Sequence, residues 1–250
     1  MRTSKRDYSA FDKFNFERKP VGIKFLLNRP DGIKKLDAGL AFCEMFRKAQ
    51  ESPPFYAEKD NFACMGSLLL GMKDPEPFFE SGEIGASDGI YQEARANRRI
   101  YQFIPRLAKN TVRYVAFSPV DTLTFEPDII VFTASVSQAE ILLRALSYST
   151  GKLLTTRTTP AIMCAWLFVH PFVSGEANYS VTGLGYGMKA RKVFPEGLML
   201  VSVPYDLLPA LTVNLQEMEW ELPAYKLSED EKNNYFKKAT EEIMQRYQDS

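Results

Sequence analysis

The sequence is short of the residues from which most recognisable catalytic and metal sites are built. Of its 250 residues, one is histidine and three are cysteine. A single histidine, His170, excludes a histidine cluster for zinc or non-haem iron. It stands among apolar residues and just before Pro171, with no Ser-His-Asp or Cys-His motif, as is typical of a packed or surface histidine.

Long apolar runs and an excess of one charge are also absent. The longest apolar segments, IIVFTA and IMCAWLFV, have strand length, whereas a membrane helix needs about 20 apolar residues. Lys and Arg together number 31, as do Asp and Glu, so no global field favours nucleic acid or anionic lipid. The polar first 20 residues lack the apolar core of a signal peptide. We therefore expect a cytoplasmic protein that binds neither nucleic acid nor membranes.

What is present is the composition of a globular protein, with 45% hydrophobic and 25% charged residues. No internal repeat or low-complexity tract interrupts it. The pattern predicts an α/β or α+β fold, with helices packed on a mixed sheet. We expect a polar N-terminal extension over residues 1–19, one globular domain over 20–225 and an appended, highly charged helix over 226–250.

The first part of the chain predicts a strand and two helices. A β-rich run after Pro20 indicates a strand over 20–27. Apolar residues at three-four spacing, with Cys43 among them, predict a helix over 32–50. The segment CMGSLLLGM predicts a shorter helix, for which Asp60 or Asn61 is the expected N-cap. Residues 74–89 are expected to form a loop.

The clearest unit lies in the middle of the chain. Residues 111–119 and 127–134 predict two strands, and the capping-box pattern Ser137-Gln138-Ala139-Glu140 starts a helix through about residue 148. Gln138 is a candidate ligand-binding residue, because ligands bind near helix N-termini at the edge of open parallel sheets; ordinary capping is the alternative. Residues 161–168 suit either a strand or a short buried helix. A strand over 197–204 and a last helix over 228–248 complete the pattern.

The three cysteines are remote from one another in the sequence. Cys43 and Cys64 lie 21 residues apart, and Cys164 follows 100 residues later. No C-x-x-C pair is present, so the spacings of zinc ribbons and ferredoxins are absent. An odd number of cysteines indicates reduced thiols. Each cysteine either packs as a small hydrophobic residue or meets the other two in the fold, where three thiolates suit a soft metal or an iron–sulfur cluster.

The segment TGLGYGMK places glycines at alternating positions, Gly183, Gly185 and Gly187. Alternating glycines allow the backbone to approach a ligand closely, and Lys189 or Arg191 after them suits an anion. The segment is not a dinucleotide-binding fingerprint, because it lacks the G-x-G-x-x-G spacing. A flexible hairpin or a bulged strand is the alternative.

Several segments together resemble a bacterial and archaeal family, the domain of unknown function 169. The matching pieces cover most of residues 20–220 in family order and are PVGIKF, AFCEMFRKAQ, KDNFACMGSLLLGM, FEPDIIVFTASVSQAEILLRALSYSTG, the cysteine of AIMCAW, NYSVTGLGYGMKAR and MLVSVPYDLLPALTVNL. The family brings no established activity with it.

The resemblance nevertheless bears on the cysteines. Members typically carry one cysteine in the first helix, one after an acidic residue and an asparagine, and one in the later segment. Cys43, Cys64 and Cys164 occupy these places, which favours metal or cluster ligation. The chain departs from the pattern at Cys64-Met65-Gly66, where many members have Cys-Pro-x-Gly. It also has GLGYGMKAR in place of a Gly-Asn-Gly-Asp-Arg-like run, which puts shared polar ligand contacts there in doubt.

We therefore hypothesise a cofactor-binding protein. Cys43, Cys64 and Cys164 would hold an iron–sulfur cluster or another thiophilic metal beside a small-molecule pocket. The expected pocket residues are Asn61, Gln138, Gly183, Gly185, Gly187 and Lys189. One alternative is a metal-free binding module with its pocket near Ser135 to Gln138 and the glycine segment. Another is an accessory subunit, or a homo-oligomer, that docks through the C-terminal helix; the sequence identifies no catalytic residue.

Overall fold

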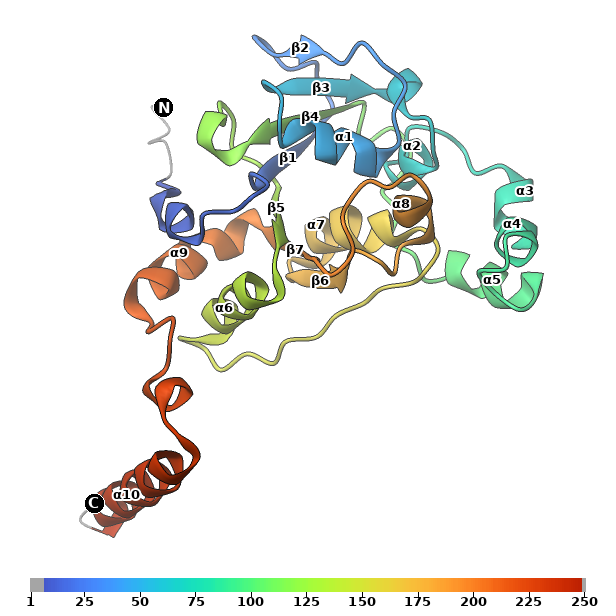
Figure 1. Cartoon of the computed structure of the whole chain (residues 1–250). Helices are drawn as coiled ribbons and strands as arrows, with labels where there is room; N and C mark the ends of the chain where they lie inside the picture. The colour runs from blue at the N-terminus through green and yellow to red at the C-terminus, as the bar shows by residue number, and fades with distance from the viewer. Residues whose placement is uncertain (1–6, 249–250) are drawn as a thin grey trace. The chain divides into compact units, whose positions relative to one another are not determined.

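The computed structural model describes residues 7–248, which form two compact units that divide after Gln216. The first unit contains a seven-stranded sheet in the order β2-β3-β4-β1-β5-β7-β6 (Figure 1). In chain order the strands are β1 (Val21–Leu26), β2 (Lys34–Lys35), β3 (Phe55–Glu58), β4 (Tyr114–Pro119), β5 (Ile129–Ala134), β6 (Asn178–Val181) and β7 (Met199–Pro204).

The sheet is mixed, as the sequence predicted, but almost all of its pairs are antiparallel. Among the strand pairs of residues 7–248, only β2 and β3 run parallel. Strand β5 is antiparallel to both of its neighbours, β1 and β7. Strand β5, which ends at Ala134, and the helix that follows it are therefore not part of a parallel βαβ unit. The rule that ligands bind at the carboxyl ends of parallel strands does not apply at Gln138.

One face of the sheet carries the largest part of the core. Helix α1 (Phe42–Ala49) and the π-helical turn η4 (Ala165–Val169) bring Phe42 and Phe168 together, with their ring centroids 4.5 Å apart. Ile129 and Val131 of β5 belong to the same cluster of buried residues. Every residue of β5 is buried, so this strand is covered on both of its faces.

The other face is covered by helices α6 and α9 and by the N-terminal turn η1. Helix α6 spans Val136–Ser147, α9 spans Leu208–Glu217 and η1 spans Ser9–Phe14. The ring of Phe11 packs edge-on against Phe132 of β5, with a centroid distance of 5.0 Å. The predicted N-terminal extension thus contributes Phe11 and Phe14 to the core, while residues 1–6 lie outside the described part.

The helix predicted over 32–50 is too long at its N-terminal end. Helix α1 begins only at Phe42, and the chain before it runs extended beside β3, where the Leu36 amide donates to the Tyr56 carbonyl. The apolar spacing before residue 41 therefore belongs to an edge segment. The helix predicted in CMGSLLLGM is confirmed as α2 (Gly66–Leu69). Its expected caps are wrong, because Asp60 and Asn61 lie in a separate 3-10 turn, η2 (Lys59–Asn61).

Short helices complete the first unit. Residues 163–168 are helical rather than extended, and η4 continues into α7 (His170–Ser174). The glycine segment enters α8 (Tyr186–Ala190). Where a loop was expected, α3 (Pro77–Glu80) and α4 (Glu83–Ser87) form, and with α5 (Ala94–Tyr101) they make a small group to one side of the sheet (Figure 1).

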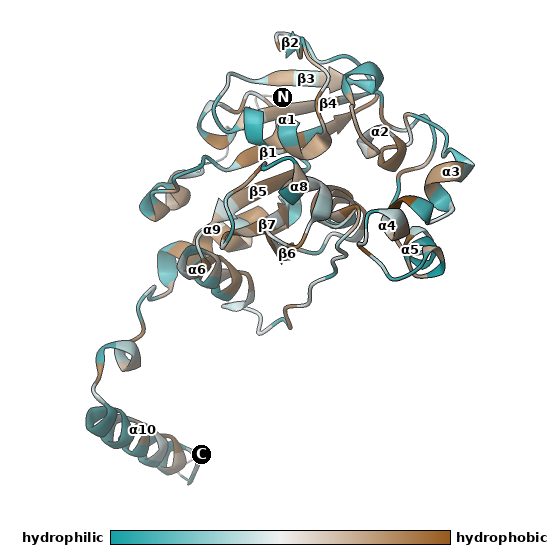
Figure 2. Cartoon of the chain, turned by 45° about the vertical axis from the view of Figure 1, so that its right-hand side comes forward, coloured by the Kyte–Doolittle hydropathy of each residue, from teal (hydrophilic) through white to brown (hydrophobic). Residues whose placement is uncertain are grey.

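The second unit consists of the turn η6 (Pro223–Lys226) and the predicted C-terminal helix, α10 (Glu229–Gln248). No residue of α10 is buried, and Figure 2 shows hydrophilic residues along most of its length. Among the helices within residues 7–248, none has the length and apolar character that crossing a membrane requires.

Candidate functional site

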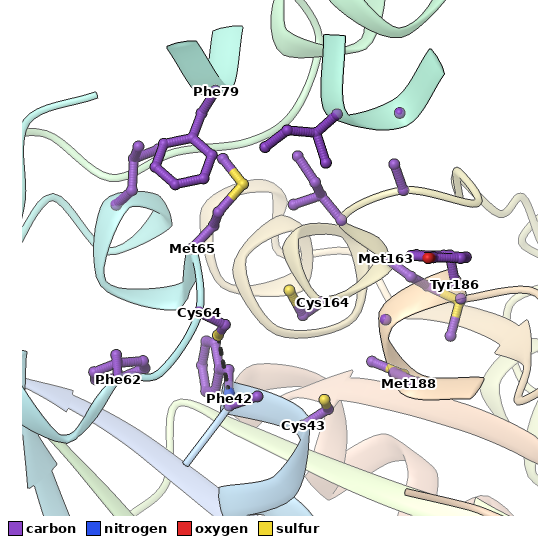
Figure 3. A pocket seen from close by; sticks show the side chains of 18 of the residues that line it. Phe42, Cys43, Phe62, Cys64, Met65, Phe79, Met163, Cys164, Tyr186 and Met188 are labelled. Atoms are coloured by element: carbon purple, nitrogen blue, oxygen red, sulfur yellow. Dashed lines mark hydrogen bonds between the residues drawn. The ribbon is translucent and has the colours of Figure 1, made fainter. Parts of the chain in front are cut away.

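A pocket of about 530 Å³ opens beside the N-terminal end of α1, and all three cysteines line it. Cys43 lies in the first turn of α1, Cys64 in the loop before α2, and Cys164 immediately before η4. Figure 3 shows the three side chains around the same space. None of the three forms a disulfide.

The sulfur of Cys64 is the most constrained of the three. Its Sγ accepts hydrogen bonds from two backbone amides, those of Phe42 at 3.2 Å and Gly66 at 3.3 Å. A side chain at residue 66 would not fit, because an added Cβ would lie 2.7 Å from the Phe62 ring and 3.0 Å from Phe42. Gly66 therefore lets α2 approach α1 closely enough to aim its first amide at the sulfur.

The other two thiols are held in their neutral form. Burial raises the pKa of Cys43 to about 12, and the neighbouring Cys64 sulfur adds to the rise. Burial likewise raises the pKa of Cys164 well above its ordinary value, with further contributions from Cys64 and then Cys43. Like charges in a desolvated site oppose ionisation of each other. The three sulfurs are thus close enough to influence one another's protonation.

The remaining walls of the pocket are mostly apolar and aromatic. Met65 and Phe79 lie on one side of the cysteines, and Met163, Tyr186 and Met188 lie on the other (Figure 3). Such walls suit a flat or apolar ligand. Charged residues also line the pocket, namely Lys73, Asp74, Glu76, Asp88 and Arg191.

One contact joins α8 to the end of α4, and a second joins α5 to the start of α4. The negative charge of Asp88, followed by burial and a hydrogen bond to the same carboxylate, raises the pKa of Tyr186. Asn97, only 2% exposed, donates to the Gly82 carbonyl at 3.0 Å. Its Oδ1 has no hydrogen-bond partner within residues 7–248, and Asn97 lines the pocket. The wall opposite the cysteines therefore contains a buried acceptor.

The structure brings two of the six predicted pocket residues to the cysteines. Gly185 and Gly187 line the pocket, and an added Cβ on Gly185 would lie 3.0 Å from Met163. Gly183 is not among the lining residues. Lys189 is also outside the lining and pairs with Glu196 at 2.8 Å.

The two predicted polar residues serve the backbone instead. Buried Asn61 donates to the carbonyls of Leu36 and Ala38 and accepts from the Glu58 amide. Gln138 belongs to the capping box of α6: its Oε1 accepts from the Ser135 amide at 2.8 Å. Its Nε2 donates to the Phe14 carbonyl at 2.9 Å. Neither lines the cysteine pocket.

His170 lies at the start of α7, outside the lining of the pocket. Its ring is 5.8 Å from that of Trp166 in an edge-to-face arrangement. Burial, and then the positive charge of Arg157, lower its pKa. The sequence left a packed and a surface histidine open, and His170 is partly buried against Trp166.

Sequence reasoning missed the wall that faces the cysteines. Ile84, Ile90, Asn97 and Tyr101 line it from α4, α5 and the segment between them. The segment before α5 gave no periodic signal, because its helices have only four and five residues. Tyr186 stands between two of the predicted glycines and was the one local clue to an aromatic wall.

The donor set fits a soft metal in its chemistry but does not form a single-ion site. Within residues 7–248, no group of three or more His, Cys, Asp or Glu side chains is arranged to hold a metal ion. One zinc ion would need all its thiolates at about 2.3 Å from a common point. The three sulfurs instead stand around the pocket.

Comparison with known proteins places the chain in a family. The model of the domain of unknown function 169 family, described as "Uncharacterised ArCR", matches residues 12–214. The chain belongs to this family. A relative in Methanocaldococcus jannaschii, the uncharacterized protein MJ0308, is 29% identical over 126 residues. That match covers 49% of this chain and 53% of the relative, so the chain spans about half the length of the curated relative. No solved structure matches the chain.

Proposed function

We propose that this member of the domain of unknown function 169 family binds an iron–sulfur cluster through Cys43, Cys64 and Cys164. The observation that carries the proposal is that all three cysteines, from three separate segments, line one pocket. Thiolates are the usual ligands of such clusters. A cluster held by three cysteines keeps one iron free for an exchangeable ligand, and the rest of the pocket offers room for a small molecule there.

The surroundings of Cys64 support this assignment. Two backbone N–H groups point at one sulfur, and hydrogen bonds to the sulfur ligands are among the features that tune cluster potentials. A neutral thiol is a weak acceptor, so two amide donors gain more from a thiolate than from a thiol.

The electrostatic influence of the cysteines on one another supports it as well, because it indicates that the three sulfurs are near one another. Cys43 and Cys164 both have raised pKa values through burial and through neighbouring sulfurs. A cation among the three thiolates offsets that repulsion, and binding releases the thiol protons. A cluster is proposed in place of one zinc ion, because a cluster distributes its thiolate ligands around a cage of several atoms and does not need them at one common point.

The test is reconstitution of the reduced protein with iron and sulfide in the absence of oxygen. We expect a brown protein with thiolate-to-iron charge-transfer absorption and stoichiometric iron and acid-labile sulfide. Cys43→Ala, Cys64→Ala and Cys164→Ala should each lose most of the bound iron. Ser67→Ala is the matched control, because Ser67 lines the same pocket without offering a soft ligand. A colourless wild-type protein after reconstitution would refute the proposal.

A metal-free binding module is the second candidate. The apolar and aromatic walls, with one buried acceptor on Asn97, favour an organic ligand of low polarity. In that case the three cysteine variants should bind an apolar fluorescent probe with the affinity of the wild type. Tyr186→Ala and Phe79→Ala should weaken the binding of this probe. The same protein preparations thus separate the two functions.

A further inference from the structure

A second cleft shares no lining residue with the cysteine pocket, and several of its lining residues carry buried, unsatisfied polar atoms. It has a volume of about 600 Å³ and lies between residues 17–19, the C-terminal end of α1 and residues 119–122. Within residues 7–248, seven buried side-chain polar atoms have no hydrogen-bond partner. Four of them belong to residues that line this one cleft, namely Nε and Nη1 of Arg18, Oε1 of Gln50 and Oγ of Ser52.

These atoms include both donors and an acceptor. The guanidinium of Arg18 supplies two donor nitrogens, Nε and Nη1, and its side chain is only 17% exposed. The hydroxyl of Ser52 can donate or accept. The amide of Gln50, a residue that is 3% exposed, has its orientation fixed by its neighbours, because its Nε2 donates to the Lys19 carbonyl and to Thr133. Its Oε1 is therefore the free acceptor.

Charge of both signs surrounds the cleft. Glu51 lies 3.9 Å from Arg18 Nη1, beyond hydrogen-bond distance, and its side chain is 69% exposed. The negative end of the α1 dipole is at Gln50, which favours a cation. Lys19 is already paired with Asp121 at 2.6 Å, and Glu17 adds a further carboxylate to the lining. A simple anion would therefore meet repulsion as well as attraction.

We propose that this cleft binds a free α-amino acid. The ligand carboxylate accepts hydrogen bonds from the Arg18 guanidinium and the Ser52 hydroxyl, which turn toward it by side-chain rotation. The ligand ammonium donates to Gln50 Oε1 and lies beside Glu51 at the negative end of α1. One zwitterion thereby satisfies the unpartnered donors and the unpartnered acceptor, and its zero net charge matches the mixed charge of the cleft. The proposal does not depend on the cysteines.

The experiment is titration calorimetry on the full-length protein with a panel of the common L-amino acids. Acetate and methylammonium serve as the two half-ligands. We expect saturable binding of at least one amino acid and binding at least tenfold weaker for either half, because each half leaves buried groups unpaired. If no amino acid binds, or if acetate binds as tightly as the best amino acid, the proposal is overturned.

Variants assign the binding to this cleft. Arg18→Met should weaken the amino acid by about tenfold or more, as expected for a lost charge-assisted hydrogen bond. Glu51→Gln should weaken amino-acid binding a few-fold. If the cleft were a site for a simple anion, the same change would strengthen binding, because it removes a negative charge. Ser52→Ala is the second probe, because a small side chain is removed with little risk to folding. Arg95→Met, at an exposed residue outside the cleft, is the control for the charge change. Unchanged affinity in both Arg18→Met and Ser52→Ala would place the ligand elsewhere and refute the site.

Discussion

At the scale of single residues, Gly66 shows how a backbone position can determine the chemistry of a neighbouring side chain. An added Cβ would meet the Phe62 ring at 2.7 Å. Gly66→Ala should therefore lower the free energy of unfolding by about 1–3 kcal/mol through overpacking. It should also reduce iron retention in the reconstituted protein, because the amide that points at Cys64 is displaced. Urea unfolding and an iron assay measure the two effects.

Gly183→Ala is the control for this prediction. It lies in the other glycine-bearing segment, and no heavy atom within 4 Å would meet its added Cβ. The free energy of unfolding of Gly183→Ala is expected to lie within about 0.5 kcal/mol of the wild-type value. Equal stabilities of the two variants would contradict the packing argument at Gly66.

The buried thiol of Cys43 should make the folded protein less stable at alkaline pH. Its pKa rises from an ordinary value of 9.0 to about 12 on folding. Between these values the folded protein keeps a proton that the unfolded chain has lost. Stability that is fully present below pH 9 should therefore fall as pH rises, by at most about 1.4 kcal/mol per pH unit.

Urea unfolding of the reduced, metal-free protein between pH 8 and 11 measures this slope. Lysine and tyrosine titration contributes equally to wild type and to Cys43→Ala, so the difference between the two slopes reports on Cys43 together with its effect on Cys164. We expect a shallower decline in the variant, whatever its stability at pH 8. Parallel declines would show that Cys43 titrates in the fold as it does in the unfolded chain.

The cysteines and glycines of the site were easier to predict from the sequence than its amide side chains. The cysteines and the glycine segment were predicted to meet, and Cys43, Cys64, Cys164, Gly185 and Gly187 do line one pocket. Asn61 and Gln138 were not distinguishable from ligand-binding residues, because an amide side chain serves a ligand and a backbone equally well. Only the tertiary contacts of each amide separate the two uses.

At the scale of elements, helix α6 illustrates this dual use. The helix was predicted, but its capping box lies two residues earlier than the pattern Ser137 to Glu140 indicated, because Ser135 is the N-cap and Gln138 completes the box. Gln138 also ties the helix to the N-terminal turn through the Phe14 carbonyl. The extended run before α1 shows the opposite outcome. Three-four apolar spacing predicted a helix there. The backbone instead forms hydrogen bonds to β3, about 20 residues later in the chain, and this tertiary pairing overrides the local periodicity.

Gln138→Ala should therefore affect stability and not ligand binding. Loss of the bonds to Ser135 and Phe14 should cost about 1–2 kcal/mol of unfolding free energy. The iron content after reconstitution should match that of the wild type. Glu140→Ala on the same helix, which loses only an i,i+4 pair with Arg144, should cost a few tenths of a kcal/mol. A stable Gln138→Ala protein with reduced iron content would return Gln138 to the candidate site.

At the scale of the whole molecule, the division after Gln216 separates a packed unit from a solvated helix. The sheet order of the first unit was beyond sequence reasoning, because antiparallel pairs such as β1 with β4 join segments about 90 residues apart and leave no local signal. The same non-local pairing brings the cysteine-bearing segments to one side of the sheet. The predicted site thus depended on a topology that the pattern itself did not predict.

The second unit should unfold separately from the first. Helix α10 has 20 residues, none of them buried, and isolated helices of this length are marginal in water. We expect far-ultraviolet circular dichroism to show a broad loss of helix at low temperature, followed by a cooperative transition of the first unit. Removal of residues 228–250 should abolish the early loss and leave the cooperative transition and the iron content unchanged. A single transition shared by the full-length chain would mean that α10 is covered, either by a partner or by a second copy. Repeating the melt over a range of protein concentrations would then identify the second copy, because only self-association makes the transition temperature depend on concentration.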